Sequence, residues 1–204
     1  MQICIVGAHT DVGKTHTSAM LCACLKYDYY KIIQAGEPKD SDFIRTFCPQ
    51  TKVYPEGYVL KTPTSPHLAK KLENAQYNAL ALTLPKSQNL IIETAGGIFS
   101  PIDEKSTMID FIKHHNLPVI LVGRYYIGGI NHILLSIKAL KTEQISLKAL
   151  IISGEQNQDF DDFITAYTGI TPLHLPFYDQ NCFADIQKVF LSELKKQQLQ
   201  KVFI

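Results

Sequence analysis

The sequence predicts an α/β fold, a doubly wound and mostly parallel sheet with helices on both faces. Short apolar runs bounded by turn residues recur along the chain, as expected of strands that are buried on both sides. Segments with apolar residues at three- and four-residue spacing, which is typical of helices, lie between these runs. This alternation indicates βαβ crossovers. Because the 204 residues contain no linker-like segment, we expect one domain over residues 1–204.

The first quarter of the chain shows the alternation clearly. An apolar run at residues 3–6 predicts the first strand, and a helical pattern follows over residues 15–26. A second apolar run, at residues 29–33, predicts the next strand. Residues 39–64 have weak periodicity and several prolines, so we expect loops at the functional edge of the sheet.

The next helix is expected to open at Ser65-Pro66. Ser65 would be its cap and Pro66 its first residue, where a missing N–H is tolerated, and the helix would run towards residue 84. The same criteria predict the remaining elements, with the last segment reading as a closing amphipathic helix. They are strands at 90–92, 118–122 and 147–152, and helices at 108–115, 130–140 and 182–198.

Charge and composition exclude several classes of function. Lys and Arg number 20 against 19 Asp and Glu, so the net charge of +1 provides no broad field for nucleic acid or anionic membranes. The chain starts without a basic, cleavable leader, and no apolar run approaches the roughly 20 residues of a membrane helix, so we expect a cytoplasmic protein. Five cysteines without C-x-x-C spacing, and histidines without a ligand pattern, favour neither disulfides nor zinc.

A phosphate-binding loop is predicted between the first strand and the first helix, in the sequence Gly7-Ala8-His9-Thr10-Asp11-Val12-Gly13-Lys14-Thr15. Backbone N–H groups of such a loop, and the start of the following helix, point at phosphate oxygens. Lys14 would neutralise phosphate charge and Thr15 would offer its hydroxyl to magnesium. The usual formula has glycine at the position of Ala8, whereas this chain has it one residue earlier. The alternative is an ordinary strand-to-helix turn.

Two carboxylates are candidates for binding magnesium beside the loop hydroxyl. Glu93 ends an apolar strand and precedes a glycine pair, so it should emerge at the carboxyl edge of the sheet, although a structural ion pair is the alternative. Asp42 lies in a loop after the second strand, and it could equally be a turn residue that caps the next segment. Lys31 lies beside the second apolar run, where a lysine usually extends to solvent.

An ordered set of motifs resembles the dethiobiotin synthetase family over most of the chain. The set comprises the variant phosphate loop, Lys31 followed by Gln34-Ala35-Gly36, Asp40-Ser41-Asp42, Pro63-Thr64-Ser65-Pro66-His67, Glu93-Thr94-Ala95-Gly96-Gly97, and Leu117-Pro118-Val119-Ile120-Leu121-Val122 leading into Gly128-Gly129-Ile130-Asn131-His132. The resemblance implies a homodimeric, ATP-dependent ligase of biotin biosynthesis. It would convert 7,8-diaminononanoate, CO2 and magnesium-ATP into dethiobiotin, ADP and phosphate, through a carbamate and a carbamic-phosphoric anhydride.

The resemblance also implies roles for individual residues. Lys31 and Lys14 would be catalytic, with Lys31 against the carbamate and the transferring phosphoryl group. Magnesium would be held by Thr15, Asp42 and Glu93. The residues expected to bind ATP are Asp11, Val12, Gly13, Lys14, Thr15, His16, Asp42, Glu93, Thr94, Ala95, Gly96, Ser153, Pro176, Phe177 and Tyr178. Those expected to bind the diamine are Thr10, Lys31, Ala35, Gly128, Gly129, Ile130 and Asn131, with the helix start near Gly128 contributed by the partner subunit to hold the distant carboxylate.

Some positions depart from the family pattern. Ala35 lacks the hydroxyl that relatives often have, and Ile32, His9 and Thr94 also differ from common residues. Ser153 and Gly154 stand where relatives commonly carry an Asn-Asp pair that reads the nucleobase, which predicts loose nucleotide choice.

The sequence also offers evidence on two alternative functions. A positioning or regulatory ATPase of the related P-loop group usually carries an extra lysine early in the loop, and residues 8–12 contain none. A scaffold without catalysis would not need Lys14, Lys31, Asp42 and Glu93.

Overall fold

The computed structural model describes residues 1–196, and a six-stranded sheet forms its centre. The strand order is β2-β5-β1-β6-β7-β8, and each neighbouring pair is parallel. The strands are β1 (Gln2–Gly7), β2 (Asp28–Lys31), β5 (Leu90–Gly97), β6 (Val119–Gly123), β7 (Leu147–Ser153) and β8 (Leu173–Leu175). A separate parallel pair joins β3 (Ile33–Ala35) to β4 (Tyr58–Leu60). The predicted parallel sheet is therefore confirmed.

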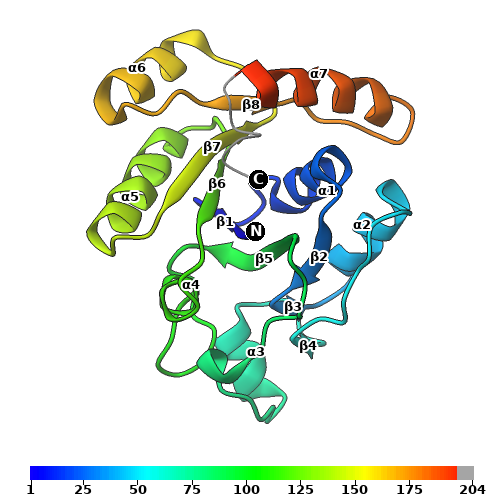
Figure 1. The fold of residues 1–204 in the computed structure, drawn as a ribbon. Coiled ribbons are helices and arrows are strands. Elements are labelled where there is room, and N and C mark those ends of the chain that lie inside the picture. The colour runs from blue at the N-terminus through cyan, green and yellow to red at the C-terminus, as the bar shows by residue number, and fades with distance from the viewer. Residues whose placement is uncertain (197–204) are drawn as a thin grey trace.

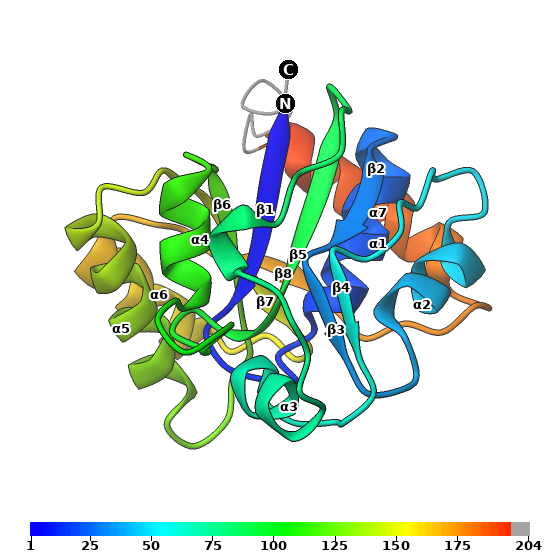
Figure 2. The same cartoon turned by 90° about the horizontal axis from the view of Figure 1, so that it is seen from below.

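Helices cover both faces of this sheet (Figures 1 and 2). One layer contains α1 (Lys14–Leu25), α2 (Asp40–Phe47) and α7 (Phe183–Lys196), and the other contains α4 (Met108–His114), α5 (Gly129–Thr142) and α6 (Gln158–Thr168). The shorter α3 (Pro66–Leu72) and a 3-10 turn, η1 (Ala79–Ala81), lie beside β3, β4 and α4. Within residues 1–196, no helix combines the length and the apolar character that crossing a membrane requires.

The apolar core divides into two clusters, one on each face of the sheet. Side chains alternate along β1, so that Ile3 and Ile5 pack in the cluster with α1, while Cys4 and Val6 pack in the cluster with α4 and α5. These four side chains are fully buried. Because β1 is central and apolar on both faces, its carboxyl end fixes the start of α1 inside the molecule.

Local signals explain where several helices begin and end. Thr107 and Asp110 form a capping box at the start of α4, and the Asn157 side chain accepts a hydrogen bond from the Phe160 N–H at the start of α6. Gly169 ends α6 with a φ of 74°, in the left-handed region. Neither α6 nor β8 was expected from the apolar pattern.

The segment 29–33 differs from its prediction because it divides at Ile32. Up to Lys31 the chain pairs with β5, and the Ile32 N–H still donates to the Glu93 carbonyl. The next residues pair with β4 instead. The chain therefore turns away from the main sheet immediately after Lys31.

Two further predictions were wrong in extent. Residues 39–64 are not only loops, because they contain α2 and β4. The helix that opens at Pro66 ends at Leu72, not near residue 84, and Asn74 follows it in the left-handed region with a φ of 50°. The closing helix is described over Phe183–Lys196, and residues 197 and 198 of its predicted range lie outside the described part.

Candidate active site

A cavity of about 770 Å3 opens at the carboxyl edge of the sheet, where the strand ends and the β1–α1 loop meet. Residues from five segments of the chain line it. They are Thr10, Asp11, Gly13, Lys14, Thr15 and His16; Lys31, Ile33, Gln34, Ala35, Pro38 and Asp40; Pro63, Thr64, Ser65 and Pro66; Glu93, Ala95, Gly96 and Ser100; and Phe177.

The loop between β1 and α1 has the conformation of a phosphate cradle. Gly13 precedes the helix with a φ of 93°, which favours glycine, and Lys14 is its first residue. A Cβ on Gly7 would lie 2.5 Å from the His9 carbonyl oxygen, so the close approach of the loop to the strand requires glycine at this position. This contact accounts for a glycine one residue before the usual place.

A cluster of charged side chains, which we call the charge cluster, lies beside the loop and consists of Lys31, Asp40 and Glu93. Lys31 Nζ lies 2.9 Å from Glu93 Oε1 and forms an ion pair with Asp40. The Thr15 hydroxyl contacts both acids, at 2.9 Å from Asp40 Oδ1 and 2.9 Å from Glu93 Oε1. Lys31 and Glu93 are directly opposite one another in the β2–β5 register. The parallel pairing of these strands therefore brings Lys31 and Glu93 together, and α2 adds Asp40.

Burial and charge shift the pKa values of these groups in different directions. Burial acts to lower the pKa of Lys31, but the charges of Glu93 and Asp40 outweigh it and the pKa is raised. Burial acts to raise the pKa of Asp40, but Lys31 and the Thr15 hydroxyl outweigh it and the pKa is lowered. Burial, followed by repulsion from Lys31, lowers the pKa of Lys14 to about 8. Lys31 is thus held as a cation by two direct ion pairs, whereas the acids around Lys14 do not outweigh its burial and the charge of Lys31.

The structure corrects the position predicted for Asp42. Its carboxylate lies 2.7 Å from Arg45 Nη1, with 61% of the side chain exposed, and it does not line the cavity. Asp40 lies beside Thr15 and Glu93 instead. On α2, Asp40 and the fully buried Ile44 are four residues apart and share the inner face, whereas Asp42 points outwards. This helical spacing could have separated the two acids, but residues 39–64 were expected to be loops.

The remaining predicted site residues fall into three groups. Thr10, Asp11, His16, Ala35, Ala95, Gly96 and Phe177 line the cavity. Val12, Thr94, Ser153 and Tyr178 are buried behind it, and Pro176 is exposed next to Phe177. Gly128, Gly129, Ile130 and Asn131 lie at the start of α5 and do not line the cavity of their own chain.

Two of the buried residues bear on the phosphate loop and its helix. Ser153 Oγ is buried without a hydrogen-bond partner within the described residues, and a Cβ on Gly13 would lie 2.2 Å from it. The Tyr178 hydroxyl donates to the His16 carbonyl in the first turn of α1. The ends of β7 and β8 therefore support the loop from behind.

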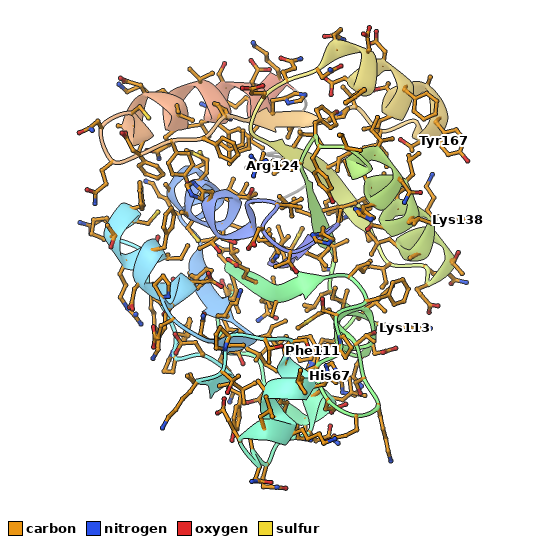
Figure 3. All side chains as sticks on the ribbon, turned by 180° about the vertical axis from the view of Figure 1, so that it is seen from behind. His67, Phe111, Lys113, Arg124, Lys138 and Tyr167 are labelled. Atoms are coloured by element: carbon orange, nitrogen blue, oxygen red, sulfur yellow. The ribbon has the colours of Figure 1, made fainter. Side chains whose placement is uncertain are left out.

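Sequence reasoning missed three residues around the site. The Tyr29 hydroxyl donates to Glu93 Oε2 at 3.0 Å, and Gln34 Oε1 accepts the Asp40 backbone N–H at 3.1 Å. The Arg124 guanidinium lies 4.7 Å from the centre of the Phe177 ring. Figure 3 shows Arg124 in the middle of the view, near α1, where its side chain is exposed, whereas Lys138 and Tyr167 lie at the outer edge. Alternation along β2 could have found Tyr29, because it shares a face with Lys31.

The oxygen atoms around Thr15 fit a magnesium ion that the protein coordinates only in part. Two carboxylates and one hydroxyl are hard oxygen ligands, which Mg2+ prefers. Within residues 1–196, no group of three or more His, Cys, Asp or Glu side chains could hold an ion by itself. Such a partial set suits an ion that takes its other ligands from water and from the phosphates of a nucleotide.

Comparison with known proteins agrees with this geometry. Residues 1–178 match a family model described as an AAA domain. Among solved structures, a candidate plasmid partition protein of Borrelia burgdorferi B31 bound to AMPPNP has a TM-score of 0.61 at 11% identity, covering 97% of this chain and 98% of that one. A ParA family ATPase of Chlorobium tepidum TLS has a TM-score of 0.50 at 15% identity, covering 99% and 96%. These structures share the P-loop fold.

Curated relatives identify the family more closely. The ATP-dependent dethiobiotin synthetase BioD of Campylobacter jejuni subsp. jejuni strain 81-176 is 52% identical over 202 residues, covering 99% of this chain and 97% of the relative. The protein of the same name from Lawsonia intracellularis is 40% identical over 200 residues, covering 97% and 98%. Because the match extends over nearly the whole of both proteins, the chain belongs to the ATP-dependent dethiobiotin synthetase family.

Proposed function

We propose that this chain closes the cyclic urea of dethiobiotin from 7,8-diaminononanoate and CO2 at the expense of ATP, as a carbon-nitrogen ligase of biotin biosynthesis. The observation that carries the proposal is the convergence of Lys14, Lys31, Thr15, Asp40 and Glu93 on one cavity beside the phosphate loop. A generic nucleotide site needs the loop and its lysine. The second buried lysine is an additional cation, suited to a reaction in which another anion must approach the phosphates.

The reaction has three bond-forming steps. One amine of the diamine forms an N–C bond to CO2 and loses a proton, which gives a carbamate. A carbamate oxygen then attacks the γ-phosphorus of ATP and ADP leaves, which gives the mixed anhydride. The second amine attacks the carbonyl carbon and loses a proton, phosphate leaves, and the ring closes.

Lys14 and Lys31 would supply the positive charge that the second step requires. Carbamate and γ-phosphate are both anionic, so their approach requires fixed positive charge more than a strong base. We assign Lys14 to the β- and γ-phosphates and Lys31 to the carbamate and the transferring group. Lys31 is suited to this role because its partners keep it charged and hold its Nζ in place. We assign ATP contacts to residues 11–16, Thr94 to Gly96, Ser153 and Pro176 to Tyr178.

We assign magnesium to Thr15, Asp40 and Glu93, with Asp40 in place of Asp42. When bound, the ion would neutralise phosphate charge and orient the γ-phosphoryl group. The protein residues would orient both carboxylates towards the loop, because Lys31 pairs with each of them and the Thr15 hydroxyl contacts each of them.

The diamine would lie at the end of the cavity formed by Thr10, Ala35 and Pro63 to Pro66. We propose a homodimer in which the start of α5 from the partner subunit binds the distant carboxylate. Backbone N–H groups at a helix start favour an anion. The position of Gly128 to Asn131 outside their own chain's cavity supports this arrangement.

Measuring two products together tests the proposal. Purified protein with ATP, Mg2+, bicarbonate and the diamine should form dethiobiotin, detected by mass, and equimolar phosphate. Phosphate release should fall to background when either the diamine or bicarbonate is omitted. A positioning ATPase would instead release phosphate without the diamine, or would require a protein or surface partner, and this outcome would remove the ligase assignment.

A further inference from the structure

The carboxylate of Glu93 is held by more than its ion pair. Its side chain is fully buried, and burying a carboxylate is unfavourable unless both oxygens find donors. Oε1 accepts from the Thr15 hydroxyl and from Lys31 Nζ, each at 2.9 Å. Within the described residues, Oε2 accepts a hydrogen bond from the Tyr29 hydroxyl at 3.0 Å. The two oxygens therefore have different partners, one set facing the phosphate loop and one facing the core.

The pairing of β2 with β5 explains why Lys31 and Tyr29 contact different oxygens of Glu93. Lys31 lies opposite Glu93 in the β2–β5 register, and Tyr29 lies two residues earlier on the same face of β2. The Tyr29 ring is fully buried in the apolar cluster with Ile3, Ile5 and Ile91, so it has no freedom to leave. A carboxylate is only an acceptor, so the hydroxyl must be the donor. The Tyr29 hydroxyl, the one polar group of this side chain, therefore contacts the Glu93 carboxylate.

We propose that Tyr29 is a positioning residue for the magnesium site, which fixes the Glu93 carboxylate so that Oε1 faces Thr15 and the nucleotide. This inference rests on the proposed function, because it takes Glu93 to be a ligand of the ion. Groups that hydrogen-bond to metal-binding carboxylates fix their orientation and strengthen metal binding. Without the hydroxyl, Oε2 would be buried without a donor, and the carboxylate would rotate towards Lys31 or admit water.

The substitution Tyr29→Phe tests the inference because it removes one hydroxyl and keeps the ring. Binding of Mn2+ to the protein with ADP, followed by electron paramagnetic resonance or calorimetry, needs no turnover. We expect Kd for Mn2+ to rise about tenfold, within the range of about 10–100-fold typical of such partners. Kd for ADP without metal should stay at the wild-type value. The Mg2+ concentration for half-maximal activity should rise in parallel, with kcat largely restored at high Mg2+.

The neighbouring residue supplies a matched control. Tyr30 is also buried on β2, but it belongs to the other core cluster and its hydroxyl donates to the Thr83 carbonyl at 3.2 Å. Tyr30→Phe should therefore leave Kd for Mn2+ unchanged. Thermal unfolding of both variants shows whether the fold is retained. A merely structural tyrosine would lower Tm and leave metal binding unaltered.

Glu93→Gln separates failure of this inference from failure of the proposed metal site. If Glu93→Gln weakens Mn2+ binding and Tyr29→Phe does not, Tyr29 has no positioning role and the metal site stands. If neither substitution changes Kd for Mn2+, Glu93 is not a ligand and both ideas are overturned.

Discussion

At the scale of single residues, the site depends on which acid beside the loop faces inwards. Asp40 and Asp42 are two residues apart, yet one contacts Thr15 and Lys31 while the other pairs with Arg45 at the surface. A surface ion pair of this kind contributes little, because solvent screens both charges. A carboxylate next to a buried lysine and a hydroxyl is in the environment of a ligand. The two acids should therefore respond very differently to the same substitution.

Paired substitutions test this difference. Asp40→Asn should raise the Mg2+ concentration for half-maximal activity by about tenfold or more, since it removes one charged ligand and one partner of Lys31. Asp42→Asn should change it less than about twofold, because the residue is outside the cavity and surface substitutions alter stability by about 0.5 kcal/mol or less. Magnesium titration of initial rates measures both. The reverse ranking would return the ligand role to Asp42.

Lys14 provides a prediction on pH. Burial and the Lys31 charge lower its pKa to about 8 in the free protein, and phosphate oxygens would favour its charged form and raise the pKa. Nucleotide binding should then take up a proton near and above pH 8, and affinity should fall as pH rises through this range. Below about pH 7 the lysine is already charged and contributes no further change.

Calorimetry of nucleotide binding at pH 8.5, in two buffers with different ionisation heats, measures the proton uptake. Lys14→Ala is the control and should show no uptake from this group, together with a loss of turnover of about a hundredfold or more and an intact fold. Wild-type protein that takes up no proton would contradict the assignment. Wild-type turnover in Lys14→Ala would contradict the role of the phosphate loop itself.

At the scale of elements, helices and strands with a long apolar pattern could be predicted from the sequence, and short ones could not. The strands β1, β6 and β7 and the helices after β1 and β6 were expected to within two residues, because buried apolar runs and helical spacing leave a strong signal. The strand β5 was expected to end at residue 92, but it continues to Gly97 through residues that form no apolar run in the sequence. The short β4 and β8, of three residues each, leave almost none. The amphipathic α2 was missed because prolines and glycine surround it. Because the helix was not expected, the sequence could not show that Asp40 faces the cavity and Asp42 faces solvent.

The ends of β6, β7 and β8 set the expected nucleotide preference. Arg124, which follows β6, lies over the ring of Phe177, which follows β8. Between these strands in the sheet, β7 ends at Ser153 and is followed by Gly154. A flat ring binds any base by its face, whereas discrimination requires donors and acceptors along the base edge. ATP, GTP and CTP should therefore support turnover with kcat/KM within about tenfold of one another. Phe177→Ala should weaken all three to a similar degree.

Initial rates with the three nucleotides at matched Mg2+ check this prediction. Phe163→Ala is a suitable control, because that aromatic side chain is exposed on α6 and does not line the cavity. A strong preference for ATP would show that other groups read the base edge. Loss of only one nucleotide in Phe177→Ala would lead to the same conclusion.

At the scale of the whole molecule, one chain leaves apolar side chains exposed on α5, on the loop before it and on the segment after β5. Phe99, Ile127 and Leu135 are each more than half exposed, and they come from the segment after β5, the loop before α5, and α5 itself. Exposed apolar side chains that gather around one element are typical of an interface. The sequence could not predict this exposed surface, because apolar residues such as Phe99, Ile127 and Leu135 are equally expected in the core.

A shared active site makes the most demanding prediction, because two inactive proteins should restore activity to one another. Lys14→Ala disables the phosphate end. It suits this purpose better than Lys31→Ala, which would leave the buried carboxylates of Asp40 and Glu93 without their cation. Gly129→Val disables the helix start, since a Cβ there would lie 2.5 Å from the Arg124 carbonyl oxygen. Each homodimer should be nearly inactive.

Subunit exchange between these two variants should place both lesions in one site of the mixed dimer and leave the other site intact. With random exchange of equal amounts, half of the dimers are mixed and one of their two sites works, so activity should return to about a quarter of the wild-type value. Native mass spectrometry verifies the exchange, and dethiobiotin formation measures the recovery. Verified exchange with activity no higher than that of the separate variants would mean that the carboxylate contact lies within one chain, and α5 would then have no part in the partner's site.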